Sequence, residues 1–167
     1  MQLPTRVFLL TGSNIEPRIS YLQEAEKMIG KQIGIILQRT EIYESEPWGF
    51  QAENNFLNLI LEVETFLTPK EVLDKLLMIE KRLGRLRKGT SYSSRTIDID
   101  ILYFGNETIK EKALQIPHPR LHLRRFTLLP LVEIAPEFEH PVLKKTNREL
   151  LDRLTDDLEV WKYQEVC

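Results

Sequence analysis

The pattern of hydrophobic and polar positions predicts a strand and then a helix in the first 34 residues. Residues 7–10 form a short, continuous apolar run typical of a buried strand, and Gly12-Ser13-Asn14 ends it. Ser20 is a candidate cap for the helix that follows. The apolar positions of this helix are Leu22, Ala25, Ile29 and Ile33.

Two more strands and a second helix are predicted between residues 35 and 84. Residues 35–43 are rich in β-branched and aromatic side chains, and residues 56–66 alternate between apolar and polar. Thr68, Pro69 and Glu71 form a helix start with a capping box, and Gly84 is a plausible terminator. The core-facing residues expected here are Leu57, Leu59, Leu61 and Val63 on the strand, and Val72, Leu73, Leu76, Leu77, Ile79 and Leu83 on the helix.

The remaining third of the chain begins with its strongest strand signal. Residues 96–104 read as a strand ending at Gly105-Asn106, and helices are expected at 128–134 and 146–154, the latter with a Thr146/Glu149 capping box. The order β-α-β-β-α-β favours a ferredoxin-like α+β fold, in which helices pack on an antiparallel sheet, with a C-terminal extension. The length predicts one domain covering residues 1–167.

Charge changes this picture only locally. Lys and Arg total 23 and Asp and Glu total 25, so the net charge of −2 gives no general attraction to nucleic acid or membrane. Residues 80–125, however, carry 11 basic and 5 acidic side chains. This basic middle segment indicates a local anion site, although chance clustering on a solvated surface is the alternative.

Two further features bear on where the protein works. The only cysteine is Cys167, so no intrachain disulfide is possible. The apolar run at residues 7–10 is too short for a signal peptide or a membrane span. We therefore expect a cytoplasmic protein.

The strand at residues 96–104 carries the strongest candidate for chemistry. Asp98 and Asp100 alternate with Ile97, Ile99 and Ile101, so both carboxylates face one side, with Cα atoms about 6.6 Å apart. Two carboxylates, completed by phosphate oxygens and water, are a common way to hold Mg²⁺. A polar outer strand face is the alternative, but aspartate is disfavoured in strands and repels a like neighbour.

A glycine- and serine-rich basic segment, residues 84–95, immediately precedes this strand. It carries Arg85, Arg87, Lys88 and Arg95, whose side chains suit phosphate oxygens. A mobile solvated loop and a nucleic-acid backbone contact are the alternatives. The segment lacks the spacing of a Walker loop.

Two other polar residues are candidates for the site, each with a structural role as the alternative. Glu80 borders the apolar stripe of its helix, so its carboxylate needs an ion-pair partner or a ligand. His118, between Pro117 and Pro119, suits a fixed hydrogen-bond donor, although a lone histidine is more often structural. No Ser-His-Asp or Cys-His set can be assembled, and the histidine spacing argues against zinc.

In order, these segments resemble the 6-hydroxymethyl-7,8-dihydropterin pyrophosphokinase family of folate biosynthesis. The resemblance covers residues 6–141, and its most specific motif is Arg95-Thr96-Ile97-Asp98-Ile99-Asp100. The other matching stretches are Gly12-Ser13-Asn14, residues 43–49, Asn55-Phe56-Leu57-Asn58, residues 80–87, Pro117-His118-Pro119-Arg120, Arg124-Arg125-Phe126 and residues 130–136.

The resemblance implies an enzyme that transfers pyrophosphate from ATP to the pterin hydroxymethyl group and releases AMP. It implies two Mg²⁺ ions held by Asp98 and Asp100, with Arg85, Arg87 and Arg95 as further catalytic residues. The ATP site it implies consists of Glu80, Arg85, Arg87, Tyr92, Arg95, Ile101, His118 and Arg124. The fold of this family is ferredoxin-like, in agreement with the predicted order of strands and helices.

The implied pterin site is a mixture of rings and hydrogen-bonding groups. Phe126 and a second aromatic ring can sandwich a flat heterocycle, and Asn58 can pair with its amide edge; ordinary core packing is the alternative for the rings. The residues implied are Ser45, Glu46, Pro47, Trp48, Phe56, Asn58, Tyr92, Asp98 and Phe126. We expect ATP and the pterin as partners of a monomer, with no nucleic acid and no membrane.

Several positions depart from the commonest family pattern. Phe56 stands where tyrosine is frequent, Tyr92 where tryptophan is common, Ser94 where proline is usual, and Leu77 where some members have a polar residue. None of these is a metal ligand. A two-metal nucleotidyltransferase and an RNA-binding ferredoxin-like module remain the competing hypotheses, and the product formed from ATP discriminates the first of them.

Overall fold

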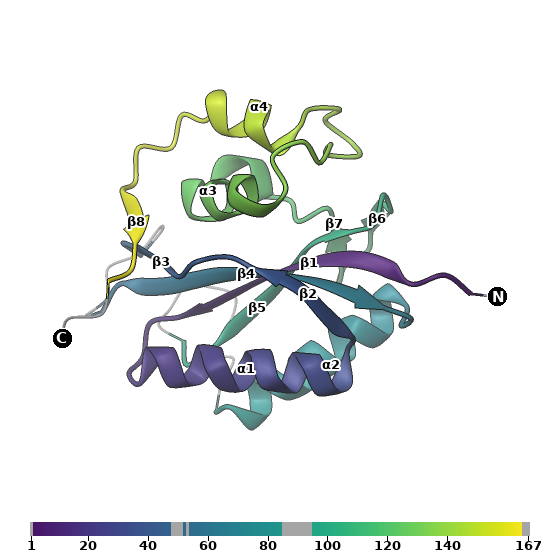
Figure 1. The fold of residues 1–167 in the computed structure, drawn as a ribbon, viewed down its shortest axis with the longest axis horizontal. Coiled ribbons are helices and arrows are strands. Elements are labelled where there is room, and N and C mark those ends of the chain that lie inside the picture. The colour runs from purple at the N-terminus through teal and green to yellow at the C-terminus, as the bar shows by residue number, and fades with distance from the viewer. Residues whose placement is uncertain (1, 48–51, 53, 85–94, 165–167) are drawn as a thin grey trace.

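A six-stranded sheet lies between two layers of helices (Figure 1). The computed structural model describes residues 2–47, 52, 54–84 and 95–164. The sheet strands are β1 (Thr5–Ser13), β2 (Ile35–Arg39), β3 (Tyr43–Ser45), β4 (Phe56–Thr65), β5 (Asp98–Phe104) and β8 (Val160–Lys162). The helices are α1 (Arg18–Gln32), α2 (Pro69–Arg82), α3 (Arg125–Ile134) and α4 (Asn147–Asp152). A short hairpin, β6 (Ile109–Lys110) and β7 (Gln115–Ile116), and a 3-10 turn at Leu121–Leu123 connect β5 to α3.

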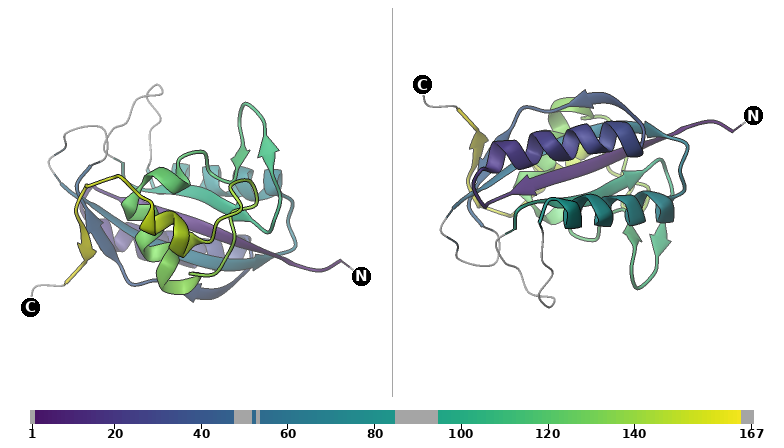
Figure 2. Two further views of the ribbon diagram at one scale, coloured as in Figure 1. Left: turned by 90° about the horizontal axis from the view of Figure 1, so that it is seen from above. Right: turned by 90° about the horizontal axis from the view of Figure 1, so that it is seen from below.

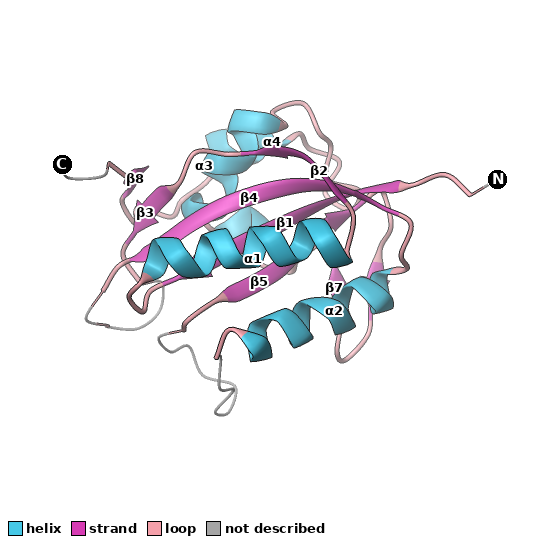
Figure 3. Ribbon diagram, turned by 60° about the horizontal axis from the view of Figure 1, so that its bottom comes forward, coloured by secondary structure: helices cyan, strands magenta, loops and turns pink. Residues whose placement is uncertain are grey.

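The strand order is that of the ferredoxin-like fold. Strands lie in the order β5-β1-β4-β3-β8, and all neighbours are antiparallel. Strand β2 pairs with a different stretch of β4 from the one that pairs with β3. Helices α1 and α2 cover one face of the sheet, and α3 and α4 cover the other (Figures 1 and 3). The predicted fold class is therefore confirmed, with α3, α4 and β8 forming the C-terminal extension.

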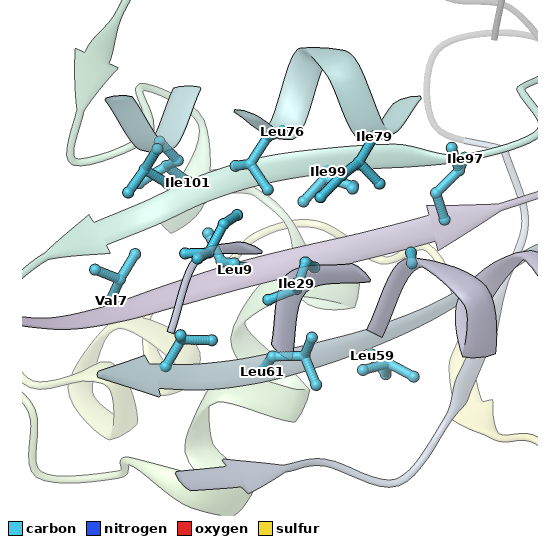
Figure 4. Close-up of a cluster of buried hydrophobic side chains, with 14 of the residues drawn as sticks. Val7, Leu9, Ile29, Leu59, Leu61, Leu76, Ile79, Ile97, Ile99 and Ile101 are labelled. Carbon is cyan, nitrogen blue, oxygen red and sulfur yellow. The ribbon is translucent and has the colours of Figure 1, made fainter. Parts of the chain in front are cut away.

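Alternation along the central strands divides the core between the two faces. Val7 and Leu9 of β1 pack towards α1 and α2, whereas Phe8 and Leu10 pack towards α3 and α4. On the first face, Leu76 and Ile79 of α2 lie beside the isoleucines of β5, whereas the leucines of β4 lie on the side of α1 (Figure 4). Ile97, Ile99 and Ile101 join this same core, which turns Asp98 and Asp100 to the opposite face.

The local helix signals were predicted correctly at two of the helices. Thr68 and Glu71 form a complete capping box on α2, and Thr146 and Glu149 form another on α4. Gly84 follows α2 with a φ of 90°, a conformation that favours glycine.

Three expectations need correction. Ser20 lies inside α1, which begins at Arg18 with Pro17 at the N-cap position; the Glu16 carboxylate accepts the Arg18 N–H there. Residues 35–43 form two strands, β2 and β3, rather than one. Leu77 is 37% exposed and does not belong to the buried stripe of α2. The hairpin β6–β7 and strand β8 were not predicted.

Antiparallel pairing brings several polar segments to one end of the sheet. Gly12, near the end of β1, is paired with Asn58 at the start of β4 and with Asp98 at the start of β5. Ser45, at the end of β3, is paired with Phe56. The two views of Figure 2 place this end of the sheet beside the N-terminal part of α3, away from the N-terminus of the chain. In the described part of the chain, no helix combines the length and apolar character needed to cross a bilayer.

Candidate active site

The polar end of the sheet contains an open cleft with about 510 Å³ of space between its atoms, part of it continuous with solvent. Its floor is the sheet face opposite α1 and α2, and its wall is the N-terminal end of α3. The lining residues are Leu10, Gly12, Ser45, Glu46, Phe56, Asn58, Arg95, Asp98, Asp100, Arg124 and Phe126. Nine of these eleven, all but Leu10 and Gly12, are site residues implied by the sequence resemblance.

Gly12 forms the centre of the cleft floor. It lies on β1 between Asn58 of β4 and Asp98 of β5, so it separates the amide side from the carboxylate side. A Cβ atom added at this position would lie 2.8 Å from Asn58 Oδ1. The Asn58 amide is 3% exposed and donates from Nδ2 to Ser45 Oγ at 3.0 Å, so it has little room to yield.

We expect Gly12→Ala to impair the amide side of the cleft selectively. The new methyl group would displace Asn58 from its bond with Ser45, and we expect KM for a ligand held there to rise about tenfold, the effect of one lost hydrogen bond of about 1.4 kcal/mol. Steady-state kinetics with each substrate varied in turn would measure this. An unchanged KM would show that Asn58 does not contact the ligand.

Arg95 and Asp98 form an ion pair at the carboxylate side of the cleft. The Arg95 guanidinium donates to Asp98 Oδ2 at 2.7 Å. Asn14 fixes the Arg95 backbone from both sides: its Oδ1 accepts the Arg95 N–H at 2.6 Å, and its own N–H donates to the Arg95 carbonyl at 3.1 Å. This double contact sets the start of β5, and hence the direction in which Asp98 points.

Asp100 is the most electrostatically perturbed carboxylate of the cleft. Burial, together with repulsion from Asp98 and Glu80, raises the pKa of Asp100 to about 7, against smaller opposing effects of Arg124 and Arg95. Its side chain is still 27% exposed. A nearby cation would stabilise the ionised form of such a carboxylate.

His118 lies above this carboxylate, with its Nε2 3.8 Å from Asp100 Oδ2. Its Nδ1 accepts the Arg120 N–H at 3.1 Å, which leaves the Nε2–H as the donor in the neutral ring. Burial and the charge of Arg124 lower the pKa of His118 to about 4. The imidazole is therefore neutral at pH 7, with its Nε2–H on the side of Asp100; its role as a fixed donor stays a prediction.

Glu80 lies on α2, on the other side of the sheet, and is not among the described residues that line the cleft. Its side chain is 2% exposed, and Oε2 accepts the Ile99 N–H at 2.8 Å, between the two aspartates of β5. This bond gives the structural reason why a carboxylate borders the apolar stripe of α2. It also ties α2 to the stretch of β5 that carries Asp98 and Asp100.

The two aspartates fit a divalent cation as a pair. They project from one strand face into the cleft, and Asp98 raises the pKa of Asp100, a repulsion that a cation would relieve. Among the described residues there is no group of three or more acidic, histidine or cysteine side chains that could hold a metal. Phosphate oxygens and water would therefore have to complete the coordination, as is usual for Mg²⁺.

The wall of the cleft is built by the start of α3. Arg124, at the N-cap position, has its guanidinium carbon 5.3 Å from the centre of the Phe126 ring, within cation–π range. Phe56 lines the cleft from β4. Two aromatic side chains therefore border a space whose floor carries an amide and two carboxylates.

Some implied site residues lie elsewhere. The Ile101 side chain is in the core between the sheet and the α1/α2 layer, on the far side from the cleft. Pro47 is half-buried next to Glu46 and is not among the lining residues. Trp48, Arg85, Arg87 and Tyr92 lie outside the described residues, as does Ser94.

Asn14, Gly12 and Leu10 were not predicted as parts of the site. Asn14 acts through the Arg95 backbone, and Leu10 lies in the floor opposite Asp100. Gly12-Ser13-Asn14 is a recognisable turn signal, but a sequence read alone assigns it only to the end of a strand. Its proximity to Arg95 depends on the pairing of β1 with β5, in which Gly12 is paired with Asp98, 86 residues later in the sequence.

Comparison with known proteins gives consistent matches over most of the chain. The sequence model of the family described as 7,8-dihydro-6-hydroxymethylpterin-pyrophosphokinase (HPPK) matches residues 8–136. A 2-amino-4-hydroxy-6-hydroxymethyldihydropteridine pyrophosphokinase of Aquifex aeolicus is 41% identical over 86% of this chain and 88% of its own. The enzyme of the same name from Bacillus subtilis is 38% identical over 79% of each chain.

Solved structures agree on the fold. A Plasmodium falciparum HPPK-DHPS structure, wild type with SDX-DHP, matches with a TM-score of 0.73 at 21% identity, over 89% of this chain. Another HPPK-DHPS structure, in complex with substrates, also gives 0.73, at 19% identity over 89% of this chain. Our chain spans 43% of each of these longer chains.

The fold and the relatives define the class of protein, an ATP-dependent transferase of the pyrophosphokinase type. Within that class, the chain belongs to the 7,8-dihydro-6-hydroxymethylpterin-pyrophosphokinase family.

Proposed function

We propose that this protein transfers the pyrophosphoryl group of ATP to the hydroxymethyl oxygen of 6-hydroxymethyl-7,8-dihydropterin and releases AMP, as a step of folate synthesis in the cytoplasm. Residues 1–167 act as one catalytic domain and a monomer. The observation that carries this proposal is the cleft itself, in which two strand carboxylates and two arginines lie beside two aromatic rings and a buried amide.

The pterin occupies the aromatic half of the cleft. Phe56 and Phe126 hold its faces, because flat heterocycles and phenyl rings stack with little loss of entropy. The Asn58 amide, kept in place by Ser45, pairs with the amide edge of the ring. Ser45 and Glu46, with Pro47 and Trp48 beyond them, border the same half.

The phosphates of ATP occupy the charged half. Arg95 and Arg124, with Arg85, Arg87, Tyr92 and the Nε2–H of His118, hold the phosphate oxygens and the nucleotide. Glu80 and Ile101 act on the nucleotide side through the β5 backbone, which Glu80 fixes at Ile99. Asp98 orients the pterin hydroxyl and accepts its proton as the new P–O bond forms and the bond to AMP breaks.

Two magnesium ions complete the site, held by Asp98 and Asp100. When bound, they supply electrostatic stabilisation of the phosphate charge and favour the incoming alkoxide. The chain contributes the two carboxylates, the arginines that flank them, and the Asn14 contacts that fix the start of β5.

The test is to incubate the protein with ATP, Mg²⁺ and 6-hydroxymethyl-7,8-dihydropterin and to separate the nucleotides. We expect AMP to appear only when the pterin is present, with no free pyrophosphate. Pyrophosphate together with an adenylated product would instead identify a nucleotidyltransferase. ADP would show transfer of a single phosphoryl group and would overturn the proposal.

A further inference from the structure

The chain beyond residue 154 lies across the cleft-forming elements as a strap, here defined as residues 155–163. The match to the family model ends at residue 136, so the strap lies outside it. In Figure 1 the strap leaves α4, passes the start of α3 and reaches the edge of the sheet as β8, beside β3. It therefore touches two elements that carry cleft residues.

One end of the strap caps α3. Arg124 occupies the N-cap position but makes no capping bond with its side chain. The cap comes from the strap instead: Asp156 Oδ2 accepts the Arg125 N–H at 2.9 Å. A carboxylate at this position accepts a hydrogen bond from a helix N–H and is stabilised by the positive end of the helix dipole. The Arg124 guanidinium has no acceptor for a helix N–H, and it lines the cleft.

Asp156 holds the same turn by a second set of contacts. Its backbone carbonyl accepts from the Arg125 guanidinium, at 2.9 Å from Nη2 and 3.3 Å from Nε. Its Oδ1 accepts the Leu158 N–H at 3.1 Å, which fixes the carboxylate relative to the strap. Arg125 therefore faces away towards the strap, while its neighbours Arg124 and Phe126 line the cleft.

The other end of the strap extends the sheet at β3. Val160 is paired with Ser45 and Trp161 with Glu44, and the Tyr163 N–H donates to the Ile42 carbonyl at 2.8 Å. The Trp161 Nε1–H also donates to Glu44 Oε1 at 3.1 Å. A three-residue strand such as β3 gains from pairing on both edges, since a single short edge strand is weakly held.

The two anchors tie the opposite borders of the aromatic half of the cleft. Phe126 lies one residue beyond the capped Arg125, and Ser45 lies in the strand that β8 pairs with. The far end of α3 is already tied to this region by Glu133, which accepts the Tyr43 hydroxyl at 2.6 Å and the Glu41 N–H at 3.1 Å. The strap fixes the near end, where Phe126 lies.

From these contacts we propose that the strap positions the pterin half of the site, with Asp156 as its principal positioning residue. The proposal rests on the proposed function for the identity of the ligand. Asp98 is bonded to Arg95, Glu80 accepts the Ile99 N–H, and Asp100 lies beside His118, all of them outside the strap. The strap borders the aromatic half of the cleft at both anchors and the charged half only through Arg124, so we expect it to affect pterin binding more than Mg-ATP binding.

The test compares Asp156→Ala with Asp156→Asn and with Asp157→Ala, a change of the exposed neighbouring aspartate. For Asp156→Ala we expect KM for the pterin to rise about tenfold, the scale of one lost helix cap, and KM for Mg-ATP to change less than about threefold. Asp156→Asn keeps an acceptor for the Arg125 N–H and should recover most of the pterin affinity. Asp157→Ala should match the parent protein.

A second measurement does not depend on turnover. Amide hydrogen exchange at the start of α3 should be faster in Asp156→Ala, with β5 unchanged. Equal increases in both KM values, or an equal effect of Asp157→Ala, would overturn the proposal, as would unchanged exchange at α3. A parent protein without pterin-dependent AMP release would instead contradict the proposed function, and the exchange experiment would still decide whether Asp156 holds α3.

Discussion

Replacing Asp100 with asparagine is expected to lower kcat by about a thousandfold or more, the scale of losing a key electrostatic group of an active site. Asparagine has nearly the same shape but no charge to hold a cation. The side chain faces the cleft rather than either core, so the fold should persist. The variant therefore separates the chemistry of Asp100 from its packing.

The same substitution is expected to stabilise the metal-free protein at alkaline pH. Because the pKa of Asp100 is raised to about 7 in the folded state, its ionisation is less favourable there than in the unfolded chain. Stability is therefore lost as pH rises from the unfolded pKa near 4 through 7. At pH 8 the asparagine variant should be more stable by about 2 kcal/mol, an estimate lowered for partial solvent exposure, and the difference should vanish near pH 4.

Urea unfolding of both proteins at pH 5 and pH 8, with and without Mg²⁺, would measure this effect. Added Mg²⁺ should stabilise the parent protein and not the variant, because a ligand stabilises only the state that binds it. Asp74→Asn, a change of an exposed aspartate on α2, is the matched control and should behave as the parent. Near-normal turnover of Asp100→Asn at limiting Mg²⁺ would refute the metal assignment.

Much of this fold could be predicted because its signals are local. The alternation of residues 57–63 and of 97–101 determines which face of each strand is buried, and the isoleucines and aspartates of β5 follow it. The capping boxes at Thr68 and Thr146 need only four consecutive residues. Such features depend on neighbouring residues in the sequence and not on contacts with distant segments.

The parts that were missed depend on contacts distant in sequence. Strand β8 is short and mostly exposed, and it forms by pairing with the edge of β3, which is more than 100 residues earlier in the sequence. Serine is a common helix cap, but α1 begins at Arg18, before Ser20, and the Arg18 N–H is bonded to the Glu16 carboxylate. The cap of α3 comes from Asp156, 31 residues beyond Arg125, where no local motif could indicate it.

The second large effect is expected at Arg95. Its guanidinium is bonded to Asp98 and lies near Asp100, so Arg95→Ala removes positive charge from the half of the cleft assigned to the phosphates. We expect kcat to fall about a thousandfold or more, because an arginine that stabilises charge during phosphoryl transfer contributes about 10³-fold to 10⁵-fold. KM for the pterin should change little, since Phe56 and Asn58 are untouched.

Arg95→Lys distinguishes charge from shape. Lysine restores a cation but not the planar fork, so we expect only partial recovery of kcat. Arg39→Ala, a change of an exposed arginine paired with Glu26 on the α1 side, is the control and should leave kinetics unchanged.

The pH profile of Arg95→Ala tests the electrostatic coupling directly. Arg95 is one of the groups that lower the pKa of Asp100, so its loss should raise that pKa further. Because binding of Mg²⁺ requires the ionised carboxylate, the acidic limb of the activity profile should move to higher pH in Arg95→Ala and return towards the parent position in Arg95→Lys. An unmoved acidic limb would mean that Arg95 acts on the phosphates alone, and that Asp100 ionises independently of it.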